Sequence, residues 1–142
     1  MKTDPLTRLR AVCLALPGAN EIVSHGDSSF RVKKHFAMFA SPHNHHGRGR
    51  PAVWIKALPV NQQLILLAHP DRVFSPPYVG PSGWIGAWLD RKVDWKEIER
   101  LVRDGYRLIA PKKLLAQLDA PAIRLTADPN GRRSRRAAPR RA

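Results

Sequence analysis

The order of the hydrophobic patterns constrains the fold of this chain more than any other feature. A helical pattern near the start is followed by several short runs that alternate apolar and polar residues, and then by a second, longer helical pattern. Most connections between the short runs are too short for the crossovers that parallel strands need. The sequence therefore predicts an α+β fold in which an antiparallel sheet carries its helices on one face.

The opening helix is expected from about Asp4 to Leu16, because apolar residues recur there at helical spacing and Pro17-Gly18 then ends the pattern. A hairpin is expected next. Its strands are Ser29–Val32 and Phe36–Ala40, and its turn is the basic segment Lys33-Lys34-His35.

The remaining pattern alternates between strand and helix. Further strands are expected at residues 52–58 and 84–89, and short helices at residues 61–68 and 112–118. Between them lies a long helix, which Asp94 begins with the spacing of a capping box.

The chain is expected to form one folded domain over residues 1–120, followed by a basic and disordered tail over residues 121–142. The tail includes a possible strand at residues 122–126. The sequence has no apolar run long enough to span a bilayer, and its start lacks the apolar stretch of a signal peptide. A single cysteine, Cys13, is expected to be buried as a small apolar residue. These features predict a cytoplasmic protein without membrane contact, and a monomer is favoured.

The charge points to the class of partner. The 142 residues carry a formal net charge of +14, and the six arginines of residues 131–142 supply only part of it. The other 130 residues hold 19 basic and 11 acidic side chains, which is a net charge of +8. A folded domain with this imbalance attracts polyanions, so nucleic acid is the first candidate partner.

One segment resembles a known family. The elements Pro76-Pro-Tyr-Val-Gly80 and Gly83-Trp84, with the helix entry Val93-Asp-Trp95 and the run Ala110-Pro-Lys-Lys-Leu114, are similar to those of the MmcQ/YjbR family. Upstream, the short run Ser24-His-Gly26 is similar to an early motif of the family, as are Leu16-Pro17-Gly18 and Ser29-Phe-Arg-Val32. The likeness extends over about residues 6–118.

This resemblance implies a frataxin-like (CyaY-like) arrangement, in which an antiparallel sheet is flanked by N-terminal and C-terminal helices. It also implies DNA binding, for which a double-wing mode has been proposed in the family, and it attaches no firm enzymatic activity. The His-rich and Arg-rich loop at residues 41–50 and the arginine tail depart from the family pattern.

The candidate nucleic-acid contacts are basic side chains of the predicted hairpin and the next loop, one aromatic side chain for base stacking, and part of the tail. They are Arg31, Lys33, Lys34, Arg48, Arg50, Lys56, Tyr78, Arg132, Arg133, Arg135 and Arg136. Among them, Arg48 and Arg50 are the strongest candidates for contacts with base edges, because a guanidinium can bind a base with two hydrogen bonds. The alternative is that the turn and the tail are merely solvated and basic. Trp84 and Trp88 could also offer stacking faces for bases, but they are expected to pack in the core.

No catalytic set, metal site or cofactor site is predicted. His43, His45 and His46 are closely spaced, but no cysteine or carboxylate completes a ligand set, and two arginines lie in the same loop. His25 and Asp27 stand beside serines, yet their closeness in sequence does not make a catalytic triad, and a turn role is expected for Asp27.

Two alternative functions remain open at this point. The first is a small-molecule-binding or enzymatic domain that uses the loop Pro76–Trp84, beside His25-Gly26, as a pocket wall. The second is an interaction protein that docks on an acidic partner. A continuous basic stripe would favour nucleic acid, whereas a deep apolar pocket containing His25 would favour a small ligand.

Overall fold

The computed structural model describes residues 4–42, 49–90 and 92–119. It divides into two compact units, Met1–Pro111 and Lys112–Ala142, which are described separately. The second unit has one described element, helix α4 (Lys112–Asp119), close to the short helix that the sequence predicts. The expected boundary after residue 120 and the possible strand at residues 122–126 lie at or beyond the end of the described chain.

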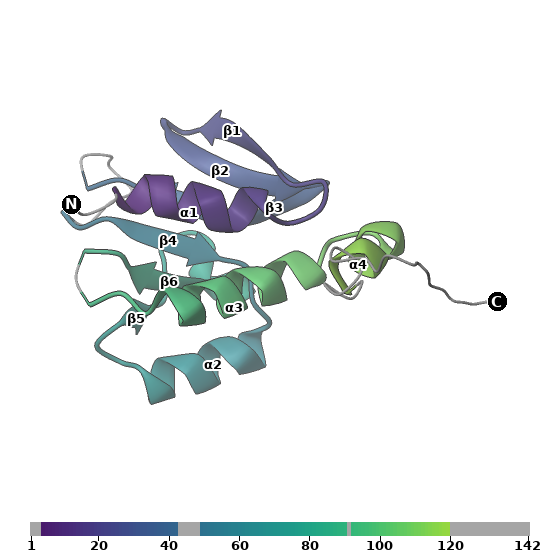
Figure 1. The fold of residues 1–142 in the computed structure, drawn as a ribbon. Coiled ribbons are helices and arrows are strands. Elements are labelled where there is room, and N and C mark those ends of the chain that lie inside the picture. Colours follow the sequence, from purple (N-terminus) through teal and green to yellow (C-terminus); the bar gives the residue numbers. More distant parts are fainter. Residues whose placement is uncertain (1–3, 43–48, 91, 120–142) are drawn as a thin grey trace. The chain divides into compact units, whose positions relative to one another are not determined.

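The first unit is built on a six-stranded sheet in the order β1-β2-β3-β4-β6-β5 (Figure 1). Every strand pair in it is antiparallel. The elements in chain order are α1 (Pro5–Leu14), β1 (Asn20–Ser24), β2 (Asp27–Val32), β3 (Lys34–Ala40), β4 (Ala52–Ile55), α2 (Pro59–Ala68), β5 (Val73–Phe74), the 3-10 turn η1 (Gly80–Ser82), β6 (Ile85–Trp88) and α3 (Trp95–Arg107). The predicted α+β class is confirmed. The similarity of this fold to that of frataxin stays a prediction.

Helices α1 and α3 begin at the aspartates that the sequence indicates. The Asp4 carboxylate accepts a hydrogen bond from the Thr7 backbone N–H at 3.1 Å, and Pro5 occupies the first turn of α1. The Asp94 carboxylate accepts from the Glu97 N–H at 3.2 Å and begins α3 in the same way.

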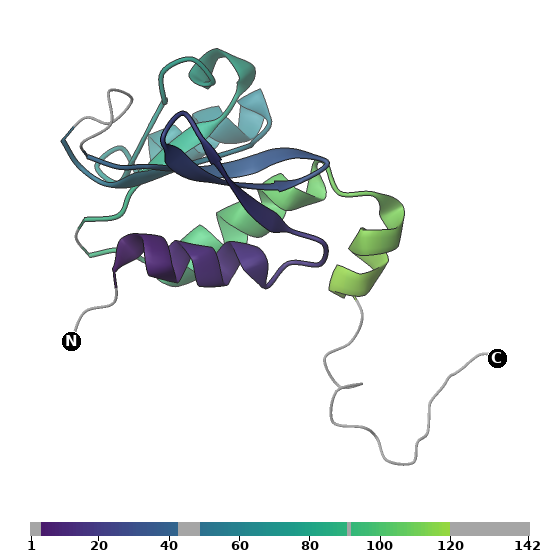
Figure 2. The ribbon, with the colours of Figure 1, turned by 90° about the horizontal axis from the view of Figure 1, so that it is seen from above.

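Helices α1 and α3 lie on the same side of the sheet, and Figure 2 shows this most clearly. A β-bulge in the β2–β3 pair skips Phe36, whose ring meets that of Tyr106 edge-on with centroids 5.6 Å apart. The fully buried side chains of this layer include Leu9, Cys13 and Ile55. Cys13 is therefore the buried apolar residue that the sequence predicts.

The opposite face of the sheet is covered by a chain segment instead of a long helix. After β5, residues 75–84 cross this face, and Trp84 packs with Trp54, Ala40 and Ala52 in a second buried cluster. Trp88 packs against the cluster and stacks on Phe74 with a centroid distance of 4.2 Å. The expectation that Trp84 and Trp88 serve the core is confirmed.

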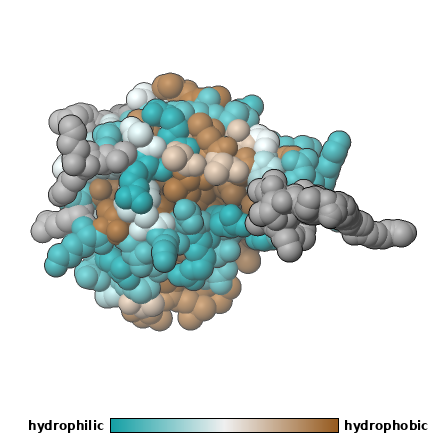
Figure 3. All heavy atoms as spheres, viewed as in Figure 1, coloured by the Kyte–Doolittle hydropathy of each residue, from teal (hydrophilic) through white to brown (hydrophobic). Residues whose placement is uncertain are grey.

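Helix α2 lies beyond the β5 edge of the sheet and exposes much apolar surface (Figures 1 and 3). Its buried residue is a polar one. The side-chain amide of Gln62 donates to the carbonyl oxygens of Gly80 and Trp84, at 2.9 and 2.6 Å, and so ties the helix to the covering segment. The exposed apolar side chains in and before this helix are Leu58, Val60, Leu64 and Leu67.

The sequence missed one strand that matters for the site. Residues 20–24 form β1, which was not predicted, and β1 joins β2 through the two-residue turn His25-Gly26. The burial of β1 alternates only weakly, and Val23 is 74% exposed at this edge of the sheet, so the pattern is hard to recognise. The short strand β5 was also missed. None of the helices in the described ranges is long and apolar enough to cross a membrane.

Candidate nucleic-acid interface

Basic side chains gather where the β2–β3 turn meets the exit from β4. Lys33 occupies the turn with a positive φ of 68°, and both Lys33 and Lys34 are exposed. Lys56 follows β4, and its backbone N–H donates to the carbonyl oxygen of Phe36 at 2.9 Å. This bond holds Lys56 beside the start of β3. We call the set Arg31, Lys33, Lys34 and Lys56 the basic sheet end.

Arg31 is the fourth member of this set. It pairs with His35 across the β2–β3 ladder, and its Nε atom is buried without a hydrogen-bond partner among the described residues. Burial, followed by the positive charge of Arg31, holds the pKa of His35 below its usual value. The contribution of Arg31 to this shift is the smaller one, and it comes from the positive charge beside the imidazole.

The described residues provide no acidic partner for the basic sheet end. None of its four cations forms a salt bridge with a carboxylate in residues 4–42, 49–90 or 92–119. The carboxylate of Asp104 lines the same cavity as Lys56 but does not pair with it. The positive charge at this end is therefore not neutralised by a described carboxylate.

Elsewhere on the first unit, carboxylates neutralise much of the positive charge. Arg10 of α1 pairs with Glu21 of β1 at 2.7 Å, and the hydroxyl of Ser28 also donates to Glu21. This pairing lowers the pKa of Glu21, with the hydrogen bond from Arg10 as the largest cause.

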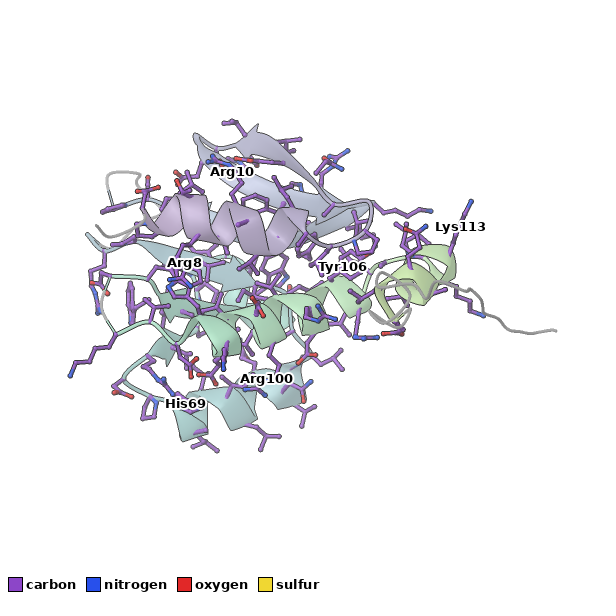
Figure 4. The ribbon with its side chains drawn as sticks, in the orientation of Figure 1. Arg8, Arg10, His69, Arg100, Tyr106 and Lys113 are labelled. Carbon is purple, nitrogen blue, oxygen red and sulfur yellow. The ribbon has the colours of Figure 1, made fainter. Side chains whose placement is uncertain are left out.

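A second cluster centres on the carboxylate of Glu97. Its oxygens lie 3.3 Å from Arg100 Nη2, 3.4 Å from Arg72 Nη2 and 3.1 Å from His69 Nε2 (Figure 4 labels His69 and Arg100). Arg10, Arg72 and Arg100 are thus paired with carboxylates, whereas the exposed cations Lys92, Lys96 and Arg103 form no salt bridge with a described carboxylate.

Arg50 lies in the loop before β4, as the sequence predicts, and apart from the basic sheet end. Its guanidinium donates to both Asp90 oxygens, at 2.6 and 2.9 Å, and lies 4.1 Å from the centre of the Trp88 ring. Residue 50 precedes β4, whereas Lys33 precedes β3. Successive turns of an antiparallel meander lie at opposite ends of the sheet. Arg50 accordingly lies near the Ala40 end of β3, and Lys33 lies next to its Lys34 end.

The other predicted nucleic-acid contacts either lie outside the described residues or lie away from the basic sheet end. Arg48, Arg132, Arg133, Arg135 and Arg136 lie outside the described residues, as do His43, His45 and His46. Tyr78 is 72% exposed, but it lies over the face of the sheet opposite α1 and α3, away from the β2–β3 turn. Three exposed cations that the sequence analysis did not single out are Lys92, Lys96 and Arg103.

The residues around His25 do not assemble a catalytic triad. The Ser24 hydroxyl lies 3.2 Å from His25 Nδ1, but the Asp27 carboxylate accepts a hydrogen bond from the Ser41 backbone N–H. Asp27 therefore has a structural role, but its carboxylate binds the distant Ser41 N–H and not the turn that the sequence predicts. Within the part of the chain that the structure describes, no group of three or more histidine, cysteine or acidic residues is arranged to hold a metal ion.

Comparison with known families agrees with the motifs in the sequence. The model of the family described as YjbR matches residues 14–108, which span β1 to α3 and both turns discussed above. The chain belongs to the YjbR family. The match confirms the resemblance carried by the early motif at Ser24–Gly26 and by the segment that follows Pro76.

A solved structure shares the fold of this YjbR protein. It is the crystal structure of the Deinococcus radiodurans protein DR2400, which carries the domain DUF419. The two chains are 20% identical, the match covers 84% of this chain and 94% of the other, and the TM-score is 0.63. An identity this low supports a common fold and carries no function across. No curated protein matches this YjbR chain.

Proposed function

We propose that this YjbR protein binds nucleic acid, duplex DNA in the first place, through the basic sheet end. One observation carries the proposal: four cations converge there and form no ion pair among the described residues, while Arg10, Arg50, Arg72 and Arg100 are all paired. Phosphate oxygens are the acceptors that such unpaired cations bind in DNA.

The side chains of the basic sheet end are suited to contacts with the sugar-phosphate backbone of DNA. Lysine acts as a flexible point charge, which suits phosphate oxygens better than base edges. The Nε of Arg31 is buried, so Arg31 contributes its positive charge to phosphate binding and not a hydrogen bond from this atom. We therefore expect binding with little sequence preference and a dissociation constant on the order of 10⁻⁴ to 10⁻⁶ M at physiological salt.

This proposal changes the roles assigned from the sequence. Base-edge contacts by Arg50 are not part of it, because Asp90 and Trp88 already occupy that guanidinium. The tail residues Arg132, Arg133, Arg135 and Arg136 retain their expected role as additional phosphate contacts. The basic sheet end is the part of the folded domain that binds.

The test compares two triple variants of the full chain. In the first, Lys33, Lys34 and Lys56 are changed to Gln. In the matched control, the exposed residues Lys92, Lys96 and Arg103 are changed to Gln, so that both proteins lose the same charge. Binding is followed by fluorescence anisotropy of a labelled duplex of about 20 base pairs in about 50 mM salt.

We expect the sheet-end variant to lose about tenfold or more in affinity, and the control to lose about threefold or less. Equal losses in the two variants would contradict the proposal, since only the total charge would then matter. A third protein, with Arg132, Arg133, Arg135 and Arg136 changed to Ser, measures the contribution of these tail residues. If unlabelled polyglutamate competes as well as unlabelled DNA at equal charge, the partner is an acidic protein instead.

A further inference from the structure

A cavity of about 400 Å³ lies on the face of the sheet opposite α1 and α3. Its walls come from the β1–β2 turn, the strands β3 and β4, and the segment that follows β5. The lining residues that matter for its chemistry are Ser24, His25, Asp27, Met38, Trp54 and Tyr78. We call this the Tyr78 pocket. It lies at the opposite end of β2 from the Lys33 turn, so it is separate from the basic sheet end.

The β1–β2 turn fixes the polar side of the pocket. Ser24 and Asp27 face each other across the ladder, which leaves His25 and Gly26 as a two-residue turn. Both have a positive φ, 53° and 85°, as a type I′ hairpin requires. The hydrogen bond from the Ser41 N–H to Asp27 Oδ2 then holds the carboxylate in place, at 3.1 Å.

Tyr78 forms the opposite wall in a strained conformation. Its φ is 68°, and the Val79 N–H donates to the Pro77 carbonyl oxygen at 2.7 Å, which makes residues 77–79 a γ-turn of the rare positive-φ type. Strain of this kind persists where the surroundings fix it, and it is found more often at ligand sites than elsewhere. The turn holds a large ring at the rim, 72% exposed, although glycine would fit the backbone without cost.

The charges around the pocket limit what can bind. Among the described residues that line the pocket there is no lysine or arginine, and Asp27 is one of them, so an anionic ligand would meet repulsion from its carboxylate. The chain as a whole carries +14, so a cationic ligand is repelled at longer range. A neutral ligand avoids both penalties.

The shapes and polar groups of the lining residues indicate what kind of neutral ligand fits the pocket. Trp54 is 5% exposed and Met38 is partly buried, and together with the Tyr78 ring they offer apolar and aromatic contacts suited to a flat molecule. A carboxylate can accept several hydrogen bonds, so Asp27 has capacity beyond the Ser41 N–H. A volume of about 400 Å³ is at the small end of the range for ligand sites.

We propose that the Tyr78 pocket binds a small, uncharged, planar heteroaromatic molecule that donates an N–H hydrogen bond to Asp27. Indole and three of its derivatives test the N–H donor and the absence of charge separately. Indole is neutral and has the N–H, and 1-methylindole lacks it. Indole-3-acetate adds a negative charge and tryptamine a positive one.

The experiment titrates each compound into the full-length, ¹⁵N-labelled protein and follows the backbone amides by NMR. We expect indole to shift the amides of Tyr78, Val79 and Ala40. We also expect indole to bind more tightly than each of the other three compounds, with 1-methylindole about threefold or more weaker because the hydrogen bond to Asp27 is lost.

Two variants locate the site, and each preserves the fold by design. Tyr78→Gly removes the ring and relieves the positive φ, and it should weaken indole about threefold to tenfold. Asp27→Asn keeps an oxygen for the Ser41 N–H while removing the charge, and it should reduce the preference for indole over 1-methylindole. Leu67→Ala on the exposed face of α2 is the control and should leave indole binding unchanged.

The proposal would be overturned by any of three results: no amide shifts with indole at millimolar concentration, shifts centred outside the Tyr78 pocket, or indole-3-acetate binding as tightly as indole. The Tyr78→Gly variant must show a native amide spectrum. If it does and still binds indole with unchanged affinity, the pocket assignment is wrong.

Discussion

Lys56 and Phe36, which are 20 residues apart in sequence, are joined by a backbone hydrogen bond of 2.9 Å from the Lys56 N–H to the Phe36 carbonyl oxygen. This bond continues the β3–β4 ladder past Ile55, the last residue of β4. It carries the lysine to the end of the sheet where Lys33 and Lys34 form the turn. The basic sheet end is therefore a consequence of strand pairing, and no helix or loop rearrangement is needed to assemble it.

Gly105 controls how closely α3 approaches this bond. A Cβ atom on Gly105 would lie 2.7 Å from the Lys56 carbonyl oxygen and 3.2 Å from Ile55 Cγ2. We expect Gly105→Ala to lower the free energy of unfolding by about 1–3 kcal/mol through overpacking, despite the gain of about 1 kcal/mol in helix propensity. Urea denaturation followed by circular dichroism measures the change. Arg103→Ala, on the exposed face of the same helix, is the control. A Gly105→Ala protein more stable than the wild type would contradict this packing.

The Arg10–Glu21 pair predicts a loss of stability in acid. Arg10 lowers the pKa of Glu21 in the folded state, so the unfolded state binds the proton more readily. The stabilisation is present above the usual pKa of about 4.5 and disappears as the pH falls through the lower, folded-state value. Glu21→Gln should make the free energy of unfolding less dependent on pH below 4.5 than in the wild type. Identical pH profiles for the two proteins would show that the pair is not formed in solution.

His35 gives a separate signal at higher pH. Its pKa is lowered by burial first and by Arg31 second, so the folded protein resists protonation more than the unfolded chain does. Stability should therefore fall as the pH drops below the ordinary value of 6.5 toward the folded-state pKa. Arg31→Gln should raise the pKa of His35 toward 6.5, as followed by NMR titration of the imidazole. Should the pKa of His35 remain the same in Arg31→Gln, the positive potential at the basic sheet end has been overstated.

DNA itself provides a second readout of the same histidine. Phosphate groups placed at the basic sheet end would offset the charge of Arg31 and favour the protonated imidazole. We expect the pKa of His35 to rise when a duplex is added, and to rise less in the Lys33, Lys34 and Lys56 variant. A pKa that does not respond to saturating DNA would mean that the phosphates bind elsewhere.

The sequence predicted the helices and the central strands because their signals are local. Asp94 followed by Trp95 and a helical apolar pattern is sufficient to place α3. The short apolar run at Ala52–Ile55 favours a strand. Strand β1 carried no such signal, since it is an edge strand with an exposed Val23 and a partly exposed Glu21. The His25-Gly26 pair was its best indication, because two-residue turns ending in glycine favour hairpins.

The site was harder to predict because its composition depends on contacts between distant residues. From the sequence, Arg50 was a reasonable candidate for a base contact. The structure shows that Asp90, 40 residues later, accepts two hydrogen bonds from its guanidinium. The sequence places Arg50 in the loop after the hairpin that contains Lys33. That this loop lies at the other end of β3 follows from the alternation of turns between the two ends of a meander, which can be applied only when the strands are known.

The salt dependence of duplex binding tests the central claim most directly. The logarithm of the association constant should fall linearly with the logarithm of salt concentration, with a slope set by the number of phosphates that the protein neutralises. Relative to the wild type, changing Lys33, Lys34 and Lys56 to Gln should make this slope shallower by about 3, while the Lys92, Lys96 and Arg103 control should change it by about 1 or less. Slopes that are the same in the wild type and the sheet-end variant would contradict DNA binding at the basic sheet end.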